Sequence, residues 1–366
     1  MIPVFNPVIT NNDIKSVLLS LRRKEISGNF SHSIIDLEER FANYCGSRFG
    51  VAVSSGTTAL HLAVASLNIN AGSEILVSAT TNIATALACY HNNCKPIAVD
   101  SRLDTWNIDE DEISKYITKK TRAIIVVHFL GNPVNMDKVL KIANKYNLYV
   151  IEDAAEAHGS TFNNKKVGSF GDIGCFSFYA NKTITSGEGG ILTTNNKKIA
   201  EKLKLMRNLG FTKKRFVHYI AGYNFRLTGY QAALALSQLK RIDSIIKKKI
   251  AIANLYKKYL KDFDGVRLQE SLKNSVNTFW MVGILNLYKK NNKIILSKKL
   301  RSFGIETRSF FLSIRKQPCF KKIYNKKDYL TTNSNYLWDN GLYLPSSINL
   351  TEAKIFYICK KIKSAY

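Results

Sequence analysis

The segment Leu148-Tyr149-Val150-Ile151-Glu152-Asp153-Ala154-Ala155-Glu156-Ala157-His158-Gly159 joins an apolar run to a group of polar side chains. Its first four residues are typical of a buried strand. Glu152, Asp153 and Glu156 follow at the carboxyl end of that strand, where open parallel sheets bind their ligands. A carboxylate there can bind a metal, act as a base or hold the N–H group of a heterocycle. It can equally be an ordinary solvated strand end, so the residues alone leave these interpretations open.

Similar apolar runs alternate with segments of helical periodicity along the first half of the chain. Leu60, Ala63, Val64 and Leu67 are spaced as one face of a helix, and residues 139–146 form a second such stripe. Strands that alternate with helices predict an α/β fold with a mostly parallel, buried central sheet. The other predicted strands are residues 51–53, 75–77, 97–99 and 123–129.

The second half of the chain predicts two long helices and then a smaller mixed unit. The helices cover residues 228–239 and 243–260, and the pattern changes from about Lys248 onward. A chain of 366 residues is long enough for two domains. We therefore predict a large domain of residues 1–247 and a smaller α+β domain of residues 248–366.

The composition is that of a globular protein, with 45% hydrophobic residues and only six prolines. The chain starts without a basic segment followed by an apolar run, and no window reaches the ~18 apolar residues that span a bilayer. We therefore expect a cytoplasmic protein without membrane insertion. The six cysteines form no CxxC pair, which predicts reduced, mostly buried thiols and no metal site.

The formal net charge of +27 has three possible origins. Lysines occur mostly as scattered pairs among many asparagines, as a genome biased towards Lys and Asn codons would produce. The charge can also form an electrostatic funnel for a diphosphate substrate. A nucleic-acid-binding protein would carry a localised basic patch or a binding motif, and neither is seen, so we expect no nucleic-acid partner.

In the segment Ser54-Ser55-Gly56-Thr57-Thr58-Ala59-Leu60 a predicted strand has just ended and a predicted helix begins. Free backbone N–H groups and the helix dipole suit a phosphate at such a position. Hydroxyl residues before a helix are also common caps, so the segment alone is weak evidence. The loop Gly222-Tyr223-Asn224-Phe225-Arg226-Leu227-Thr228 by itself likewise reads as an ordinary loop before a helix cap.

Lys182 lies in the mostly uncharged segment Phe176-Ser177-Phe178-Tyr179-Ala180-Asn181-Lys182-Thr183-Ile184-Thr185-Ser186-Gly187-Glu188-Gly189-Gly190. The other lysines have the distribution of surface residues. Burial lowers the pKa of a lysine and makes its neutral amine available as a nucleophile. The glycines lack the GxGxxG spacing of a dinucleotide-binding loop, and no Walker lysine motif occurs.

Together these segments resemble the DegT/DnrJ/EryC1/StrS family of sugar aminotransferases, which have the type I, aspartate-aminotransferase fold of pyridoxal-phosphate enzymes. The resemblance covers nearly the whole chain, and its motifs are long and specific. It implies a large domain that binds the cofactor and a smaller carboxyl-terminal domain. The segments that carry it are Ile2–Val4, Ser55–His61, Glu152–Gly159, Ser177–Gly190, Gly222–Arg226 and Glu306–Arg308.

The resemblance implies pyridoxal 5'-phosphate (PLP) as cofactor, with PMP as its aminated form. Lys182 would be the Schiff-base lysine and Asp153 the partner of the pyridine nitrogen. Glu156 stands where the family often has a glutamine near the phenolic oxygen. The remaining residues implied for the cofactor are Gly56, Thr57, Thr58 and Ser177 at the phosphate, Asn82 near the ring, and Asn224 reaching the phosphate from the neighbouring subunit.

The same resemblance implies transfer of an amino group from L-glutamate to a nucleotide-linked keto sugar, for surface polysaccharide biosynthesis. We favour a 4-keto-6-deoxy sugar on guanosine or thymidine diphosphate. The alternative is a sugar 3-aminotransferase acting on a dTDP- or UDP-linked keto sugar. A related dehydratase has histidine where this chain has Lys182, and a non-catalytic regulatory member would need neither Lys182 nor Asp153. Because Asn224 would act across subunits, an obligate homodimer follows.

The substrate side of the site departs from the family pattern. Asn82 occupies the place where many members put an aromatic ring over the cofactor, and Ser313 and Arg315 replace the usual proline and histidine. We expect His158, Arg308 and Arg315 to contact substrate. Because the changes lie near the sugar-nucleotide entrance, the identity of the sugar does not follow from the resemblance.

Overall fold

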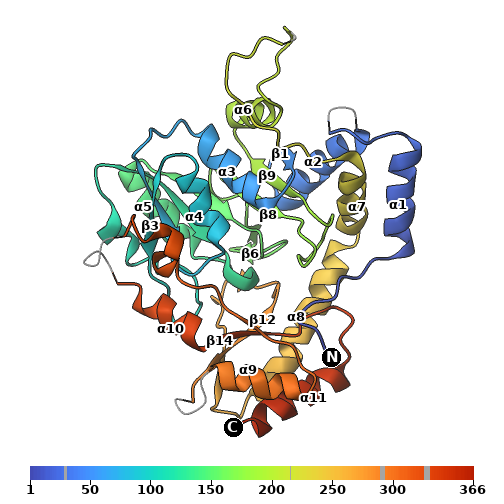
Figure 1. Ribbon diagram of the computed structural model, residues 1–366, viewed down its shortest axis with the longest axis vertical. Coiled ribbons are helices and arrows are strands. Elements are labelled where there is room, and N and C mark those ends of the chain that lie inside the picture. The colour runs from blue at the N-terminus through green and yellow to red at the C-terminus, as the bar shows by residue number, and fades with distance from the viewer. Residues whose placement is uncertain (29–30, 215, 289–292, 325–329) are drawn as a thin grey trace.

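The computed structural model describes residues 1–28, 31–214, 216–288, 293–324 and 330–366. A seven-stranded sheet forms the centre of its larger part (Figure 1). Four neighbouring pairs are parallel, and β9 alone runs antiparallel to both of its neighbours among the strands described. The mostly parallel sheet that the sequence predicts is thus confirmed. Its strands, in spatial order, are β1 (Phe49–Val53), β9 (Gly190–Thr194), β8 (Ile173–Ser177), β5 (Tyr149–Asp153), β4 (Thr121–Val127), β2 (Glu74–Ser78) and β3 (Lys95–Val99).

Alternate residues of each strand face two separate cores. Ile125 points into a core with helices α3 and α4, whereas Ile124 and Val126 point into a core with α5 on the other face. Because both faces of the sheet are covered, its strands read as continuous apolar runs rather than as alternating patterns. The helices of this part are α1 (Asn11–Arg22), α2 (His32–Cys45), α3 (Gly56–Ser66), α4 (Ile83–Tyr90), α5 (Met136–Tyr146), α6 (Lys197–Arg207) and α7 (Gly229–Leu239).

The carboxyl-terminal part packs helices against a four-stranded antiparallel sheet. Helix α8 links it to the larger part and runs without a break across position 247, so the predicted domain boundary lies inside a helix and stays a prediction. The amino terminus returns to this part, since Ile2 forms a β-bridge with Ile305. The elements are α8 (Ile242–Leu260), α9 (Lys293–Ser302), α10 (Thr332–Asn340), α11 (Glu352–Ser364), and strands β10 (Val266–Leu268), β12 (Val282–Asn286), β14 (Gly341–Leu344) and β13 (Arg308–Ser309).

The remaining elements are short and lie around these two sheets. A small third sheet joins two strands near residue 164 with one from the carboxyl-terminal half. No helix in the described ranges is both long and apolar enough to cross a bilayer. The short elements are β6 (Thr161–Phe162), β7 (Lys165–Lys166), β11 (Ser275–Val276) and the 3-10 helices η1 (Ile113–Tyr116), η2 (Phe129–Gly131), η3 (Ile314–Lys316) and η4 (Pro318–Phe320).

Candidate active site

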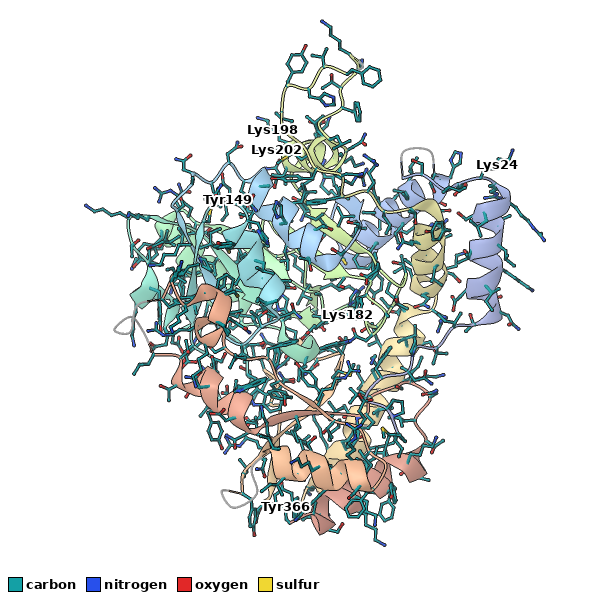
Figure 2. The ribbon with its side chains drawn as sticks, in the orientation of Figure 1. Lys24, Tyr149, Lys182, Lys198, Lys202 and Tyr366 are labelled. Carbon is teal, nitrogen blue, oxygen red and sulfur yellow. The ribbon has the colours of Figure 1, made fainter. Side chains whose placement is uncertain are left out.

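A cavity of about 320 Å³ lies between the carboxyl edge of the central sheet and the carboxyl-terminal part. Lys182 lines this cavity and lies near the middle of the molecule (Figure 2). The strand ends of β5 and β8 contribute Asp153 and Ser177 to its wall, and the amino terminus of α3 contributes Gly56 and Thr57. This is the edge at which a parallel sheet is expected to bind its ligand.

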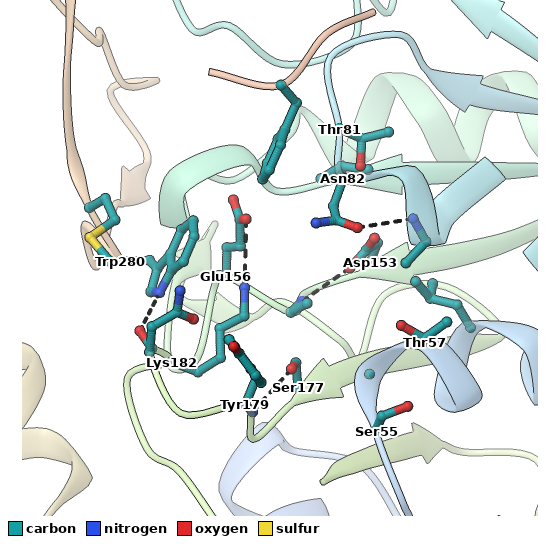
Figure 3. A pocket seen from close by; sticks show the side chains of 18 of the residues that line it. Ser55, Thr57, Thr81, Asn82, Asp153, Glu156, Ser177, Tyr179, Lys182 and Trp280 are labelled. Carbon is teal, nitrogen blue, oxygen red and sulfur yellow. Dashed lines mark hydrogen bonds and ion pairs between the residues drawn. The ribbon is translucent and has the colours of Figure 1, made fainter. Parts of the chain in front are cut away.

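Lys182 is positioned by the turn that follows β8. Its N–H donates to the carbonyl of Tyr179 at 2.9 Å, and its side chain points into the cavity (Figure 3). The Nζ atom lies 3.6 Å from Oε1 of Glu156 and 3.9 Å from the centroid of the Trp280 ring. Burial lowers the pKa of Lys182, although the carboxylates of Glu156 and Asp153 oppose that shift. The amine is therefore prepared to lose its proton and attack a carbonyl carbon.

Asp153 ends strand β5 and is 5% exposed. Its Oδ2 accepts a hydrogen bond of 2.7 Å from the hydroxyl of Thr85, and its Oδ1 accepts the N–H of Ala155 at 3.2 Å. Burial raises the pKa of Asp153, while these two bonds and the charge of Lys182 act in the opposite direction. The carboxylate is thus buried and fixed in orientation.

Glu156 is held on the other side of the lysine. Its Oε2 accepts the N–H of Leu130 at 3.0 Å, which leaves Oε1 towards Lys182. Leu130 has a φ of 58°, so the backbone turns there into the left-handed region and presents its N–H to the carboxylate. Burial raises the pKa of Glu156, and the nearby charge of Lys182 lowers it.

The amino terminus of α3 is shaped for an anion. Ser55 caps the helix, and its hydroxyl accepts the N–H of Thr58 at 3.1 Å. The first backbone bond of the helix runs from Ala59 to Ser55, so the amides of Gly56 and Thr57 precede the helical ladder. A Cβ on Gly56 would lie 2.7 Å from the Cβ of Ser177, so only glycine allows this close approach.

Most of the sequence-predicted cofactor residues meet at this cavity. Gly56, Thr57, Asn82 and Ser177 line it together with the lysine and the two carboxylates (Figure 3). Asn82 also caps α4, since its Oδ1 accepts the N–H of Ala84 at 3.0 Å. Thr58 is not among the residues that line the cavity, because its hydroxyl is engaged in the capping box with Ser55.

Two predicted substrate residues, His158 and Arg315, do not line this cavity. His158 is fully buried, and its ring packs on Phe41, Phe176 and Phe178 beneath the sheet rather than facing the cavity. Burial, aided by the charge of Lys182, lowers the pKa of His158 to about 3, so the ring is neutral. Arg315 lines a different cavity, where its guanidinium lies 5.8 Å from the ring centroid of Tyr324.

Arg308 and Asn224 complete the predicted set. Arg308 lines the cavity, and its Nη2 lies 3.4 Å from Oε1 of Glu306. Asn224 lies outside the cavity of its own chain, in a loop where it bridges to Asn208. That position agrees with the expectation that Asn224 serves a neighbouring subunit and does not test it.

The sequence reasoning did not identify Thr85 or Trp280 as site residues. Thr85 lies within an apolar helix and bonds to Asp153, while Trp280 comes from the carboxyl-terminal part and donates from Nε1 to the carbonyl of Asn181 at 2.7 Å. Only the tertiary fold brings Thr85 to Asp153 and Trp280 to Lys182. The sequence signal for Trp280 is limited to a tryptophan inside the predicted smaller domain.

The donor set fits a pyridoxal-phosphate molecule. A largely buried lysine, a buried carboxylate and a helix terminus that suits a phosphate line one cavity. Solved structures with the same fold include the Helicobacter pylori aminotransferase PseC, involved in the biosynthesis of pseudoaminic acid. The TM-score is 0.94 and the identity 27%, with 100% of this chain and 99% of that chain covered. The chain is a pyridoxal-phosphate-dependent aminotransferase.

Sequence comparison identifies the family. The model of the DegT/DnrJ/EryC1/StrS aminotransferase family matches residues 7–363, and the chain belongs to that family. A GDP-perosamine synthase from Escherichia coli O157:H7 is 37% identical over 366 residues, with 100% of this chain and 98% of that protein covered. The GDP-perosamine synthase of Caulobacter vibrioides is 35% identical, with 97% of this chain and 95% of that protein covered.

Proposed function

We propose that this enzyme transfers the amino group of L-glutamate to the keto carbon of a 4-keto-6-deoxy sugar carried by guanosine diphosphate, in the cytoplasm, for surface polysaccharide biosynthesis. The observation that carries the proposal is the placement of Lys182, Asp153 and Arg308 around one cavity. Similarity to GDP-perosamine synthases over nearly the full length supports the choice of sugar. The dehydratase alternative is disfavoured because Lys182 stands where those relatives have histidine.

Lys182 is assigned two tasks. Its neutral amine would hold the cofactor covalently, and Nζ would be placed to carry a proton once the amino donor has taken its place. Nζ contacts Glu156 at 3.6 Å and the ring of Trp280, and these two contacts hold the amine at one position in the cavity. When bound, pyridoxal phosphate supplies a ring that accepts the electrons of a carbanion.

Asp153 and Glu156 are assigned to the two polar atoms of the cofactor ring, the nitrogen and the phenolic oxygen. Asp153 would hold the ring nitrogen in its protonated form, because a buried negative charge favours the protonated form of its neighbour. Thr85 and Ala155 hold Asp153 in place for this task. Glu156 serves the phenolic oxygen, next to the Lys182 amine.

The phosphate is assigned to the amides of Gly56 and Thr57 and to the hydroxyl of Ser177. These groups meet where the α3 dipole favours negative charge. Arg308 is assigned to an anionic group of the substrate, since its side chain is half exposed and reaches the cavity from the carboxyl-terminal part.

The activity test offers the enzyme L-glutamate and a matched panel of nucleotide keto sugars, which differ in nucleotide and in the position of the ketone. Mass spectrometry then identifies any aminated product. We expect amination of the GDP-linked 4-keto-6-deoxy sugar, and none with the Lys182→Ala variant. Preferential amination of a 3-keto sugar on dTDP or UDP would select the alternative, and loss of water without nitrogen uptake would select a dehydratase.

We also propose an obligate homodimer in which Asn224 reaches the phosphate bound by the other subunit. The test mixes two disabled variants, Lys182→Ala and Asn224→Asp, the second of which sets a carboxylate against the phosphate. In a mixed dimer one site carries both defects and the other carries neither. Joint unfolding and refolding should restore activity to a fraction of the sites. If mixed dimers form without activity, the two residues do not act across an interface.

A further inference from the structure

A second cavity, of only about 20 Å³, shares Lys182 with the candidate active site. It lies where the amino-terminal segment, the loop after β8 and helices α7 and α8 meet. A space of this size holds one water-sized particle and excludes phosphate, acetate and larger groups. Its wall is formed by residues 5–8, Lys182, Thr183, Thr185, Gln238, Arg241, Ile245, Lys249 and Ile348.

Three buried side-chain atoms in this wall lack a hydrogen-bond partner within the described part of the chain. They are Thr183 Oγ1, Gln238 Nε2 and Arg241 Nε. The orientation of Gln238 is fixed because its Oε1 accepts the N–H of Thr185 at 2.9 Å, which makes the amide nitrogen the free end. A buried donor without an acceptor is costly, and because all three residues line this one small cavity, an acceptor placed in it could serve them together.

Lys249 adds a positive charge to the same wall. It is 2% exposed, and its Nζ donates to the carbonyls of Trp280 and Ser346 at 3.0 and 3.2 Å. An ammonium group has three donors, so one proton remains beyond these two bonds. Burial lowers the pKa of Lys249 to about 7, as expected for a charge in a site without a counter-ion.

We propose that this cavity binds one monatomic anion, with chloride as its ligand in the cell, held by Thr183, Gln238, Arg241 and Lys249. Among the described residues that form the wall, Arg241 and Lys249 are cations besides Lys182, and none is a carboxylate. Asp13, which pairs with Arg241, is not part of the wall. A water molecule has two lone pairs and cannot accept from four donors, whereas a chloride ion can.

The anion connects parts of the chain that are far apart in sequence. It joins the loop that carries Lys182 to α7 and α8 and to the segment that follows the amino terminus. Because the folded protein binds the ion and the unfolded chain does not, the ion stabilises the fold in proportion to its concentration. This inference does not depend on the identity of the sugar substrate.

The direct test is a crystal structure of the whole enzyme prepared in bromide, with anomalous scattering measured at the bromine edge. We expect an anomalous peak between Gln238 and Lys249. A Gln238→Glu variant keeps an acceptor for Thr185 but replaces the free donor with a negative charge, so the peak should disappear. Gln231→Glu makes the same charge change on the same helix, outside the cavity wall, and should keep the peak.

Thermal unfolding tests the binding of the anion independently, in solution. At equal ionic strength, replacing gluconate by chloride should raise the melting temperature of the wild type and of Gln231→Glu, and leave that of Gln238→Glu unchanged. The absence of an anomalous peak in the wild type, with density for water alone, would overturn the proposal, and this result needs no variant. An equal chloride effect in all three proteins would overturn it as well.

Discussion

The hydroxyl of Thr85 donates a 2.7 Å hydrogen bond to Oδ2 of Asp153, and both side chains are buried. Thr85 in turn pairs with the hydroxyl of Thr81 at 2.8 Å, so a short chain of hydroxyls on α4 and the loop before it ends on this carboxylate. A residue on a helix thereby fixes a side chain at the end of a strand. Burial raises the pKa of Asp153, and the bond from Thr85 opposes that shift together with the N–H of Ala155 and the charges of Lys182 and His128.

Replacement of Thr85 by valine keeps the shape of the side chain and removes the donor. The pKa of Asp153 should then rise further, because the lost bond is one of the contributions that lower it. A hydrogen bond to a charged group is worth ~1.5–3 kcal/mol, so turnover should fall by about tenfold or more. Steady-state kinetics check this, with Thr85→Ser as the control that restores the donor. Unchanged turnover in the valine variant would show that Thr85 does not support Asp153.

The role of Glu156 is tested through the protonation of Lys182. Burial lowers the pKa of this lysine, and the carboxylates of Glu156 and Asp153 raise it. Glu156→Gln removes one of the two opposing charges, so the pKa of Lys182 should fall further. The neutral amine is the form that attacks the cofactor, and the pH midpoint for association with pyridoxal phosphate should therefore shift downward.

The measurement is the rate of absorbance change when cofactor-free enzyme is mixed with pyridoxal phosphate across a range of pH. Glu188→Gln is the matched control, because Glu188 also lines the cavity but does not contribute to the pKa shift of Lys182. We expect the control to keep the wild-type midpoint. A midpoint that stays fixed or moves upward in Glu156→Gln contradicts the assigned interaction.

The sequence predicts strands β1 to β5 well, because each contains a continuous apolar run. Strands β8 and β9 are less visible, because Gly174 interrupts β8 and β9 begins with Gly190. Gly174 in β8 is required by packing, because a Cβ there would lie 2.4 Å from the carbonyl oxygen of Gly168. A residue that usually argues against a strand is thus needed for this strand to pack.

Some residues of the candidate site can likewise be predicted from the sequence, and others cannot. Lys182 and Asp153 belong to long local motifs and can be found without a structure. Trp280 acts through a contact between segments about a hundred residues apart, which no local pattern encodes. His158 lies in the same motif as Asp153 but points below the sheet, and side chains that follow a strand can face either way.

A buried ion pair outside the site should account for much of the link between α1 and α7. Asp13 has no exposed surface and accepts bonds from Thr10, Ser237 and Arg241. Burial raises the pKa of Asp13, but these bonds and the arginine charge outweigh it, and the net shift is downward. The stabilisation is therefore present above the unfolded-state pKa near 3.8 and is lost as the pH falls through the lower folded-state pKa.

Asp13→Ala leaves Arg241 without its partner and should lower the free energy of unfolding by about 3 kcal/mol at pH 7. Urea unfolding at pH 7 and at successively lower pH checks this value. The difference from the wild type should shrink as the solution becomes more acidic, because the wild-type carboxylate is then protonated as well. A loss under about 0.5 kcal/mol at pH 7 would remove the pair from this role.

The central claim is that Lys182 holds the cofactor. Lys249 is the informative competitor, because it is also buried and burial lowers its pKa to about 7. Reduction of the pyridoxal-phosphate-loaded enzyme with borohydride fixes the cofactor to its lysine, and peptide mass spectrometry then locates the added group. We predict modification of the peptide that contains Lys182, with the peptide containing Lys249 unmodified. A pyridoxyl group on Lys249 or on any other lysine, with Lys182 unmodified, would contradict the account.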